Sequence, residues 1–379
     1  MIIETIHLHN FRSHEDSHFT FGPKINLFYG DNGMGKTNVL EAIHYLCLTK
    51  SFLASKDQYV LRFGAASFET TGAFIREDGV QMQAKLIFVP GEGKRIFINK
   101  IPQNTLSQVI GKFPLVIFSP DDRALTSEGP EVRRKFLNNI LSQVKPLYLQ
   151  DLLLYQRAVA QRNALLLQLK RQRLKQSEQL ISWNEELIQT GSRIIRQRVR
   201  FFQTFLPFLQ QAHHAISAVG EIPHIRYQTI EFSDSIEFGD SEAVEQAFRK
   251  KLTRLQHSEI EMGRSLVGPH RDEMIFLLNK LEIRRFASHG QHRTFGLMLQ
   301  LAKYFYLAEH MNEKPILLLD DIFGDLDSKR SKIFLDLLCS EQIGQCIITA
   351  VENKTFNTVI SFEDTSNKCF HINHKSYNP

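Results

Sequence analysis

The pattern of apolar and polar positions divides the chain into three parts. The first part is typical of strands around one helix, because short apolar or alternating runs are separated by turns rich in Gly. Strands are predicted at 2–8, 19–21, 25–29, 69–75, 81–89, 95–99 and 115–118, and a helix at 38–43.

The middle part has the pattern of helices. Apolar residues recur at spacings of three and four, which predicts helices over 132–141, 147–169, 177–205 and 243–255, with a strand over 225–232. Pro207 and the turn at 220–223 are expected to break the helical pattern. The two longest helices fit either an antiparallel arm or, because their apolar stripes are broad, the buried helices of a compact lobe.

The last part returns to alternating helices and strands. Two apolar runs, at 316–319 and 346–349, are continuous enough to predict strands buried on both faces. The other elements predicted here are strands at 273–278 and 282–286 and helices at 293–310 and 328–338.

Composition and charge narrow the class of protein. Hydrophobic residues make up 42% and charged residues 23% of the 379 residues, as in ordinary globular proteins. No run reaches the roughly 18 apolar residues of a membrane helix, and the start lacks the features of a secretory signal. Four cysteines without a C-x-x-C pair are typical of free thiols in a reducing compartment, so we expect a cytoplasmic protein that contacts no membrane.

Positive charge is concentrated in the helical middle part. Residues 151–215 hold ten Lys and Arg against four acids, or +6, whereas the whole chain carries +5, so the remainder sums to −1. Such a concentration predicts a polyanion partner, although a solvated helix face is the simpler explanation for any single residue. The residues that we expect to contact DNA phosphates are Arg162, Lys170, Arg171, Arg173, Lys175, Arg196 and Arg200.

The segment Gly30–Thr37 matches the phosphate-binding pattern G-x-x-x-x-G-K-[ST] between a predicted strand and a predicted helix. The glycines let backbone N–H groups point at phosphate oxygens, and the helix N-terminus adds partial positive charge. Lys36 is expected to reach the β- and γ-phosphates and Thr37 to hold Mg²⁺. The predicted nucleotide contacts are Gly30, Asp31, Asn32, Gly33, Met34, Gly35, Lys36, Thr37 and Asn38.

A second acidic motif supplies the other half of this site. The apolar strand at 316–319 ends in Asp320 and Asp321, which is the Walker B arrangement. Asp320 is expected to complete the Mg²⁺ shell, and Asp321 to act with Lys36 in catalysis by orienting or deprotonating the attacking water.

Residues 288–291 resemble the signature motif of the ATP-binding-cassette superfamily. The resemblance implies that Ser288, Gly290 and Gln291 face the γ-phosphate of a nucleotide held by a second protomer; the alternative is a plain helix N-cap at Ser288. Gly324–Asp327 resembles the D-loop of the same superfamily, and Thr349 stands where many members carry a switch His.

The order of these motifs predicts the fold and the domains. Roughly 280 residues separate the P-loop from the acid pair, and an insertion between the two halves of an ATPase head resembles the structural-maintenance-of-chromosomes (SMC) layout. We therefore predict an α/β head of the ABC/SMC P-loop type, built from residues 1–120 and 256–379, with a mainly helical arm lobe inserted at 121–255.

Several motifs together resemble the bacterial RecF family, and the resemblance runs from end to end. The segments that carry it are 8–13, 30–43, 118–122, 129–138, 155–158, 161–166, 267–272, 288–291 and 320–327. Arg123, His289 and the pair Gly324-Asp325 depart from the residues expected in that family, but none of them removes a group that the chemistry requires.

The resemblance implies a recombination mediator. Such proteins bind ATP and Mg²⁺, form an ATP-dependent homodimer and bind DNA at single-strand gaps. They act with RecR and RecO to help load RecA in repair, fork restart and SOS induction, and slow ATP hydrolysis resets the clamp. By the same resemblance, Arg12 should lie beside the nucleotide.

Two other functions remain as alternatives. The chain would be a subunit of a transporter-type ATPase if its partner were a membrane protein, but the basic insertion argues against this. It would be part of an SMC-like nuclease if it held a metal-binding nuclease domain, and no segment supplies one. Under the RecF resemblance, we expect a weak DNA-dependent ATPase that serves as a switch rather than as a metabolic enzyme.

Overall fold

A computed structural model describes residues 1–174, 178–216, 222–230 and 241–372. The chain forms two compact units. The first comprises Met1–Arg123, Gln211–Val219 and Arg293–Pro379, and the second comprises Ala124–Gln210 and Gly220–His292. The chain therefore crosses between the units several times, and the first unit is assembled from both ends of the sequence.

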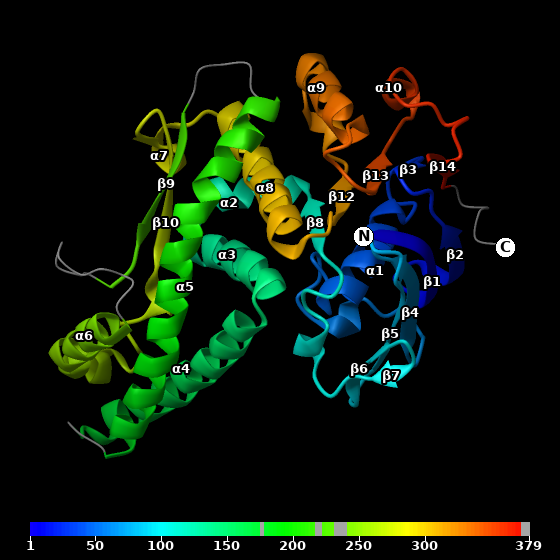
Figure 1. The fold of residues 1–379 in the computed structure, drawn as a ribbon. Helices are drawn as coiled ribbons and strands as arrows, with labels where there is room; N and C mark the ends of the chain where they lie inside the picture. Colours follow the sequence, from blue (N-terminus) through cyan, green and yellow to red (C-terminus); the bar gives the residue numbers. More distant parts are fainter. Residues whose placement is uncertain (175–177, 217–221, 231–240, 373–379) are drawn as a thin grey trace. The chain divides into compact units, whose positions relative to one another are not determined.

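The first unit contains two sheets (Figure 1). One is antiparallel, in the order β2-β1-β4-β5-β6-β7: β1 Ile2–Phe11, β2 His14–Thr20, β4 Phe68–Ile75, β5 Gln81–Val89, β6 Gly93–Ile98 and β7 Ile101–Pro102. The other is parallel, in the order β14-β3-β13-β12-β8: β3 Ile25–Tyr29, β8 Leu115–Phe118, β12 Ile316–Asp320, β13 Cys346–Ala350 and β14 Lys368–His371.

Helix α1 (Lys36–Leu48) packs against strands of both sheets (Figure 1). Its apolar residues are buried all round, as expected for a helix enclosed on every side. The same hydrophobic core takes in Ile3 and Phe74 from the antiparallel sheet and Leu318 and Ile347 from the parallel sheet. Because α1 begins within the P-loop, this core holds the loop in place.

Strands β12 and β13 are completely buried, which explains their continuous apolar sequence. Helix α9 (Ser328–Cys339) packs on this sheet through Phe334, whose ring centroid lies 5.7 Å from that of Phe118. The short α10 (Lys354–Asn357) follows β13, and Phe356 meets Phe323 edge to face. The helix before β12 is α8 (His289–Met311).

The second unit is mainly helical with a small antiparallel sheet. Leu166, Leu180 and Ile260, from three different helices, share one apolar cluster, so the long helices form a lobe with a core of its own. Its helices are α2 Ala124–Ser127, α3 Pro130–Val144, α4 Pro146–Gln172, the first part of α5 Glu178–Ile216, α6 Ser241–Met262 and α7 Ile283–Phe286. Its sheet has the order β11-β10-β9: β9 Pro223–Gln228, β10 Glu273–Leu278 and β11 Leu281–Glu282.

Two predictions about local structure were wrong. Helix α5 continues through Pro207, because Phe205 and Leu209 on either side remain buried while the proline ring faces solvent. The strand expected at 282–286 is only the two-residue β11 followed by α7, since burial of Ile283 and the exposure of its neighbours suit one helical turn.

The compact units also differ from the predicted segments. The second unit runs on to His292 rather than to residue 255, because β10 pairs with β9 and Arg162 binds Glu259. Within the described residues, no helix combines the length and apolar character that a membrane crossing requires.

A half-buried carboxyl group lies where the chain leaves the first unit. Asp122 accepts hydrogen bonds from the backbone N–H of Ser119 (2.9 Å) and from Nε2 of Gln300 (2.5 Å). Burial raises the pKa of Asp122 to about 7 and lowers the pKa of Lys303, whose charge acts on it, to about 8. Folding therefore favours the protonated carboxyl.

This carboxyl group should make the free energy of unfolding depend on pH. Its contribution is fully present below the unfolded pKa of 3.8 and is lost as the pH rises to about 7, because the folded state binds the proton more tightly. We expect Asp122→Asn, which cannot ionise, to gain stability relative to wild type between pH 5 and pH 8 in urea unfolding. The neighbouring Asp121→Asn is the control, and equal pH profiles for wild type and Asp122→Asn would contradict the assignment.

Candidate functional site

The P-loop connects β3 to α1, and its backbone requires glycine at the first position. Gly30 has φ 141°, and a Cβ there would lie 2.3 Å from the carbonyl oxygen of Ile372. Gly35, in the left-handed conformation with φ 90°, caps the N-terminus of α1. The loop thus directs the first N–H groups of α1 towards the site, as a phosphate requires.

Lys36 folds back on the loop and is only 8% exposed. Its Nζ donates hydrogen bonds to the carbonyl oxygens of Gly30 (2.6 Å) and Asp31 (2.7 Å). Burial lowers the pKa of Lys36, and the nearby carboxylates Asp321, Asp31 and Asp320 partly offset this. These carboxylates outnumber the ammonium, so a phosphate bound here would need a cation beside it.

The structure brings the P-loop hydroxyl and the first acid of the pair into contact. Thr37 Oγ1 donates a hydrogen bond to Asp320 Oδ1 at 2.7 Å, and Thr349 Oγ1 donates to the same oxygen at 2.8 Å. Burial raises the pKa of Asp320, while the two hydroxyl donors lower it. The two donors are neutral hydroxyls, so they offset only part of the free-energy cost of burying the charged carboxylate.

These oxygen donors fit Mg²⁺. The ion prefers hard oxygen ligands and is usually bound by one or two protein groups together with substrate phosphates and water. In the part of the chain that the structure describes, no group of three or more His, Cys, Asp or Glu side chains is arranged to hold a metal. Thr37 and Asp320 would therefore hold Mg²⁺ only together with a nucleotide.

Asp321 lies just beyond the end of β12 and is exposed. It has φ 48°, in the left-handed region that few residues other than Gly adopt. Its backbone N–H donates a hydrogen bond to Thr349 Oγ1 at 3.0 Å. The predicted catalytic carboxylate is thus held by a turn rather than by the strand.

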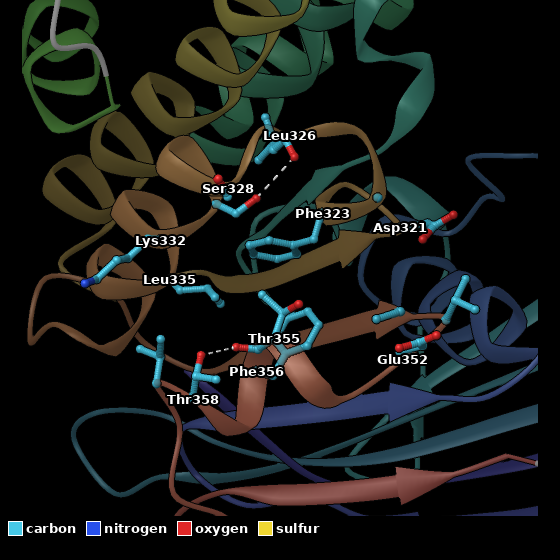
Figure 2. Close-up of a pocket in the computed structure, with 15 residues that line it drawn as sticks. Asp321, Phe323, Leu326, Ser328, Lys332, Leu335, Glu352, Thr355, Phe356 and Thr358 are labelled. Carbon is cyan, nitrogen blue, oxygen red and sulfur yellow. Dashed lines mark hydrogen bonds between the residues drawn. The ribbon is translucent and has the colours of Figure 1, made fainter.

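The first unit has a larger and a smaller cavity. The larger, about 740 Å³, is lined by Asp321, by residues of α9 and by the segment after β13 (Figure 2). Figure 2 shows Phe323 and Phe356 near one another in its apolar wall, with Lys332 and Glu352 at its margins. The smaller cavity, about 350 Å³, is bordered by P-loop residues and by the loop after β13. Val351 and Glu352 line both cavities.

Arg12 lies in a loop beside α1 and is bound to a buried carboxylate. Its guanidinium donates to Glu41 through Nε and Nη2, both at 2.7 Å, and to the carbonyl of Tyr59 at 2.6 Å. Glu41 is completely buried and also accepts a hydrogen bond from Ser51. The position of Arg12 beside the nucleotide stays a prediction, but its observed partners are structural.

Sequence reasoning missed Ser13 and His14, which attach this loop to the P-loop. Asn38 Nδ2 donates to Ser13 Oγ at 2.8 Å, and the ring of His14 lies 3.3 Å from the carbonyl of Gly35. Burial lowers the pKa of His14, so the ring is neutral at physiological pH. The available signal was the segment Asn10–His14, polar except for Phe11, after a predicted strand.

The signature segment belongs to the second unit and forms a capping box. Ser288 N–H donates to Gln291 Oε1 (2.9 Å), and Gln291 N–H donates to Ser288 Oγ (3.3 Å). The plain N-cap that the sequence left open is therefore present. Ser288 and Gly290 are both exposed, which leaves them accessible to a second molecule.

Comparisons with known proteins agree with this geometry. A family model described as RecF/RecN/SMC N terminal domain matches residues 2–375. The chain is 46% identical to the DNA replication and repair protein RecF of Salinibacter ruber (strain DSM 13855 / M31), covering 98% of this chain and 90% of the relative. It is 42% identical to that of Chloroherpeton thalassium (strain ATCC 35110 / GB-78), covering 93% and 95%. The chain belongs to the RecF family.

Solved structures confirm the predicted fold. The recombination mediator protein RecF-ATPrS in the RecFOR pathway superposes with a TM-score of 0.89 at 30% identity, covering 98% of this chain and 96% of that one. An Smc head bound to the C-winged helix domain of ScpA, at 14% identity, shares the fold with a TM-score of 0.52, covering 95% and 92%. The ABC/SMC-type head with an inserted helical lobe is therefore confirmed for this RecF-family chain.

The buried Arg162 was wrongly predicted to contact DNA. It is 0% exposed, and its guanidinium binds Glu259 (2.5 Å), Ser265 (2.8 Å) and Asn184 (2.7 Å). A buried charge needs such partners, so this arginine stabilises the lobe and cannot meet a phosphate.

The other predicted DNA contacts of this RecF-family chain differ in exposure. Lys170 and Arg171, in the last turn of α4, are exposed, as is Arg173, its C-cap. Arg200 on α5 is exposed and Arg196 is half-buried. Lys175 lies outside the described residues.

The RecF-like segment at 267–272 is structural. His270 Nδ1 lies 2.5 Å from the hydroxyl of Tyr155, and burial lowers the pKa of the ring to about 4. Arg198, buried, donates to Asp272 Oδ2 and to the carbonyl of Pro269, each at 2.7 Å. These bonds fix the loop that precedes β10.

The Arg12–Glu41 pair should be required for stability. Arg12→Ala would leave the buried Glu41 carboxylate without its cation, and we expect the free energy of unfolding to fall by roughly 2–4 kcal/mol, since Arg12 is partly exposed. Adding Glu41→Gln should recover at least half of that decrease. The free energies of unfolding of wild type, the two single variants and the double variant are measured in urea without nucleotide. If the effects of the two substitutions simply add, Arg12 and Glu41 do not stabilise the fold as a pair.

Proposed function

We propose that the chain is an ATP-dependent, dimerising recombination mediator that binds DNA at single-strand gaps. The observation that carries the proposal is the contact of Thr37 with Asp320, which joins the P-loop to the acid pair on a RecF-family fold. Membership of that family favours this function over the transporter-type and nuclease alternatives.

ATP with Mg²⁺ is the proposed cofactor. Residues 30–38 would bind the phosphates, Thr37 and Asp320 would hold the ion, and Asp321 would act on the attacking water. The solved RecF-ATP structure, 30% identical and with a TM-score of 0.86, supports this choice of nucleotide.

A second copy of the chain is the proposed partner at the signature. A Cβ at Gly290 would meet nothing within 4 Å, so the fold of this chain does not itself demand glycine there. A glycine in open space at a helix N-terminus suits close approach by another molecule. Ser288, Gly290 and Gln291 would then cap the γ-phosphate of nucleotide bound by the other protomer.

Hydrolysis in this proposal is slow and serves as a timer. ATP closes the dimer on DNA, and hydrolysis reopens it. In the pathway the clamp would act with RecR and RecO to help load RecA during repair, fork restart and SOS induction, in the cytoplasm.

Lys36→Met should abolish ATP-dependent dimerisation and the accompanying gain in DNA affinity, because the methionine cannot neutralise the phosphates. We expect wild type, measured by light scattering and by gapped-DNA binding, to dimerise and bind DNA more tightly with ATP. Lys112→Met is the matched control, since Lys112 is exposed in the same unit. A wild-type monomer whose DNA affinity ignores ATP would exclude the clamp.

Ser288→Arg separates nucleotide binding from dimerisation. This variant should bind ATP with an affinity within about threefold of wild type but remain monomeric, since a bulky cation occupies the exposed signature. Loss of ATP binding by the monomer would show that the signature does not act in trans.

Exposed cations at the end of α4 should contribute to DNA affinity. Replacing Lys170, Arg171 and Arg173 with Ala should weaken binding of gapped DNA with ATP. The dependence of log K on log salt concentration should become shallower by up to about 3, roughly one for each phosphate that the variant no longer neutralises.

The control removes three charges elsewhere, with the half-buried Lys85 and the exposed Arg95 and Lys112 replaced by Ala. It lowers the net charge equally and should leave the slope unchanged. Equal slopes for the two triple variants would mean that the α4 end makes no phosphate contact.

A further inference from the structure

Thr349 occupies a position on β13 from which it touches both acids of the pair. Its hydroxyl donates a hydrogen bond to Asp320 Oδ1 (2.8 Å) and accepts one from the backbone N–H of Asp321 (3.0 Å). The residue is 1% exposed, so no solvent competes for these bonds. One hydroxyl thus links the side chain of one acid to the main chain of the other.

The hydrogen bond to Asp321 lies just past the point where the backbone pairing of β12 with β13 ends. Asp320 and Thr349 are the last paired residues of β12 and β13. Beyond them Asp321 turns into the left-handed conformation, which costs free energy in a residue other than Gly. The Thr349 hydroxyl satisfies the N–H that this turn would otherwise leave without a backbone acceptor.

The bond to Asp320 engages one of its two carboxylate oxygens. Thr37 and Thr349 both donate to Oδ1, and within the described residues no hydrogen bond reaches Oδ2. The unshared lone pairs of Oδ2 are therefore the more available for a cation or its bound water. Without Thr349, only the Thr37 hydroxyl would restrain the carboxylate, and that hydroxyl must itself face the ion.

The strand that carries Thr349 also contacts the P-loop. β13 lies between β3 and β12 in the sheet, and Gly30 N–H donates to the carbonyl of Val351, two residues after Thr349, at 3.3 Å. The end of β13 therefore contacts both halves of the site: the P-loop through its backbone and the acid pair through the Thr349 hydroxyl.

We propose that Thr349 is the positioning residue of the acid pair: its hydroxyl holds Asp320 and Asp321 in one arrangement and thereby sets how strongly Mg²⁺ enhances nucleotide binding. The inference rests on the proposed nucleotide site. Phosphate contacts of the P-loop do not pass through Thr349, so nucleotide affinity without Mg²⁺ is independent of it.

Thr349→Val removes the hydroxyl and keeps the shape, whereas Thr349→Ser keeps the hydroxyl and removes the methyl group. By calorimetry with ATP, we expect the affinity of Thr349→Val in EDTA to stay within about twofold of wild type. Its enhancement by Mg²⁺ should fall about tenfold, the usual effect of removing one hydrogen bond. Thr349→Ser should restore the enhancement to within about threefold of wild type.

Thr70→Val is the matched control. Thr70 is also completely buried on a strand of the same unit, and its hydroxyl has no hydrogen-bond partner in the described structure. This variant should keep the full Mg²⁺ enhancement, and thermal unfolding of all variants reports any loss of folding.

The outcomes are distinct. Full Mg²⁺ enhancement in Thr349→Val overturns the proposal. So does a defect in Thr349→Ser with none in Thr349→Val, which would assign the effect to packing of the methyl group. Loss of affinity in EDTA together with a lowered melting temperature would make the residue merely structural. Failure of wild type to bind ATP would instead refute the proposed nucleotide site.

Discussion

The hydrogen bond from Thr37 to Asp320 is the contact on which the site depends, and it joins residues 283 positions apart in the sequence. It can form only because β3, β13 and β12 are neighbours in one parallel sheet and end at the same edge. The buried core around α1 keeps that edge in place from the other side. The two ends of the chain must therefore fold together before the site exists.

The arginines and lysines of this protein fall into two groups: some stabilise the fold, and others are exposed and available for binding. Arg162, Arg198 and Arg12 each end on a carboxylate that is buried, and such pairs are costly to break. Among the described residues, no buried carboxylate pairs with the exposed cations at the end of α4. A segment rich in Arg and Lys can therefore include both structural and surface residues. Only their burial in the folded structure tells the two kinds apart.

The helical lobe owes its form to apolar contacts made along its length. Helix α5 continues past Pro207 because the apolar residues on both sides of it are buried. Apolar residues of α4, α5 and α6 also pack into one shared core. The signature segment folds with this lobe, because β10 pairs with β9 and a network of hydrogen bonds around Asp272 fixes the preceding loop.

The sequence alone determined the strand–loop–helix of the P-loop, the buried strand that ends in Asp320, and most elements, because these follow from local periodicity and from motifs with short spacing. Only the tertiary structure decided the rest. The pairing of Arg12 with Glu41, the burial of Arg162 and the double contact of Thr349 join residues remote in sequence, and no local pattern records which side chains meet once the strands are ordered.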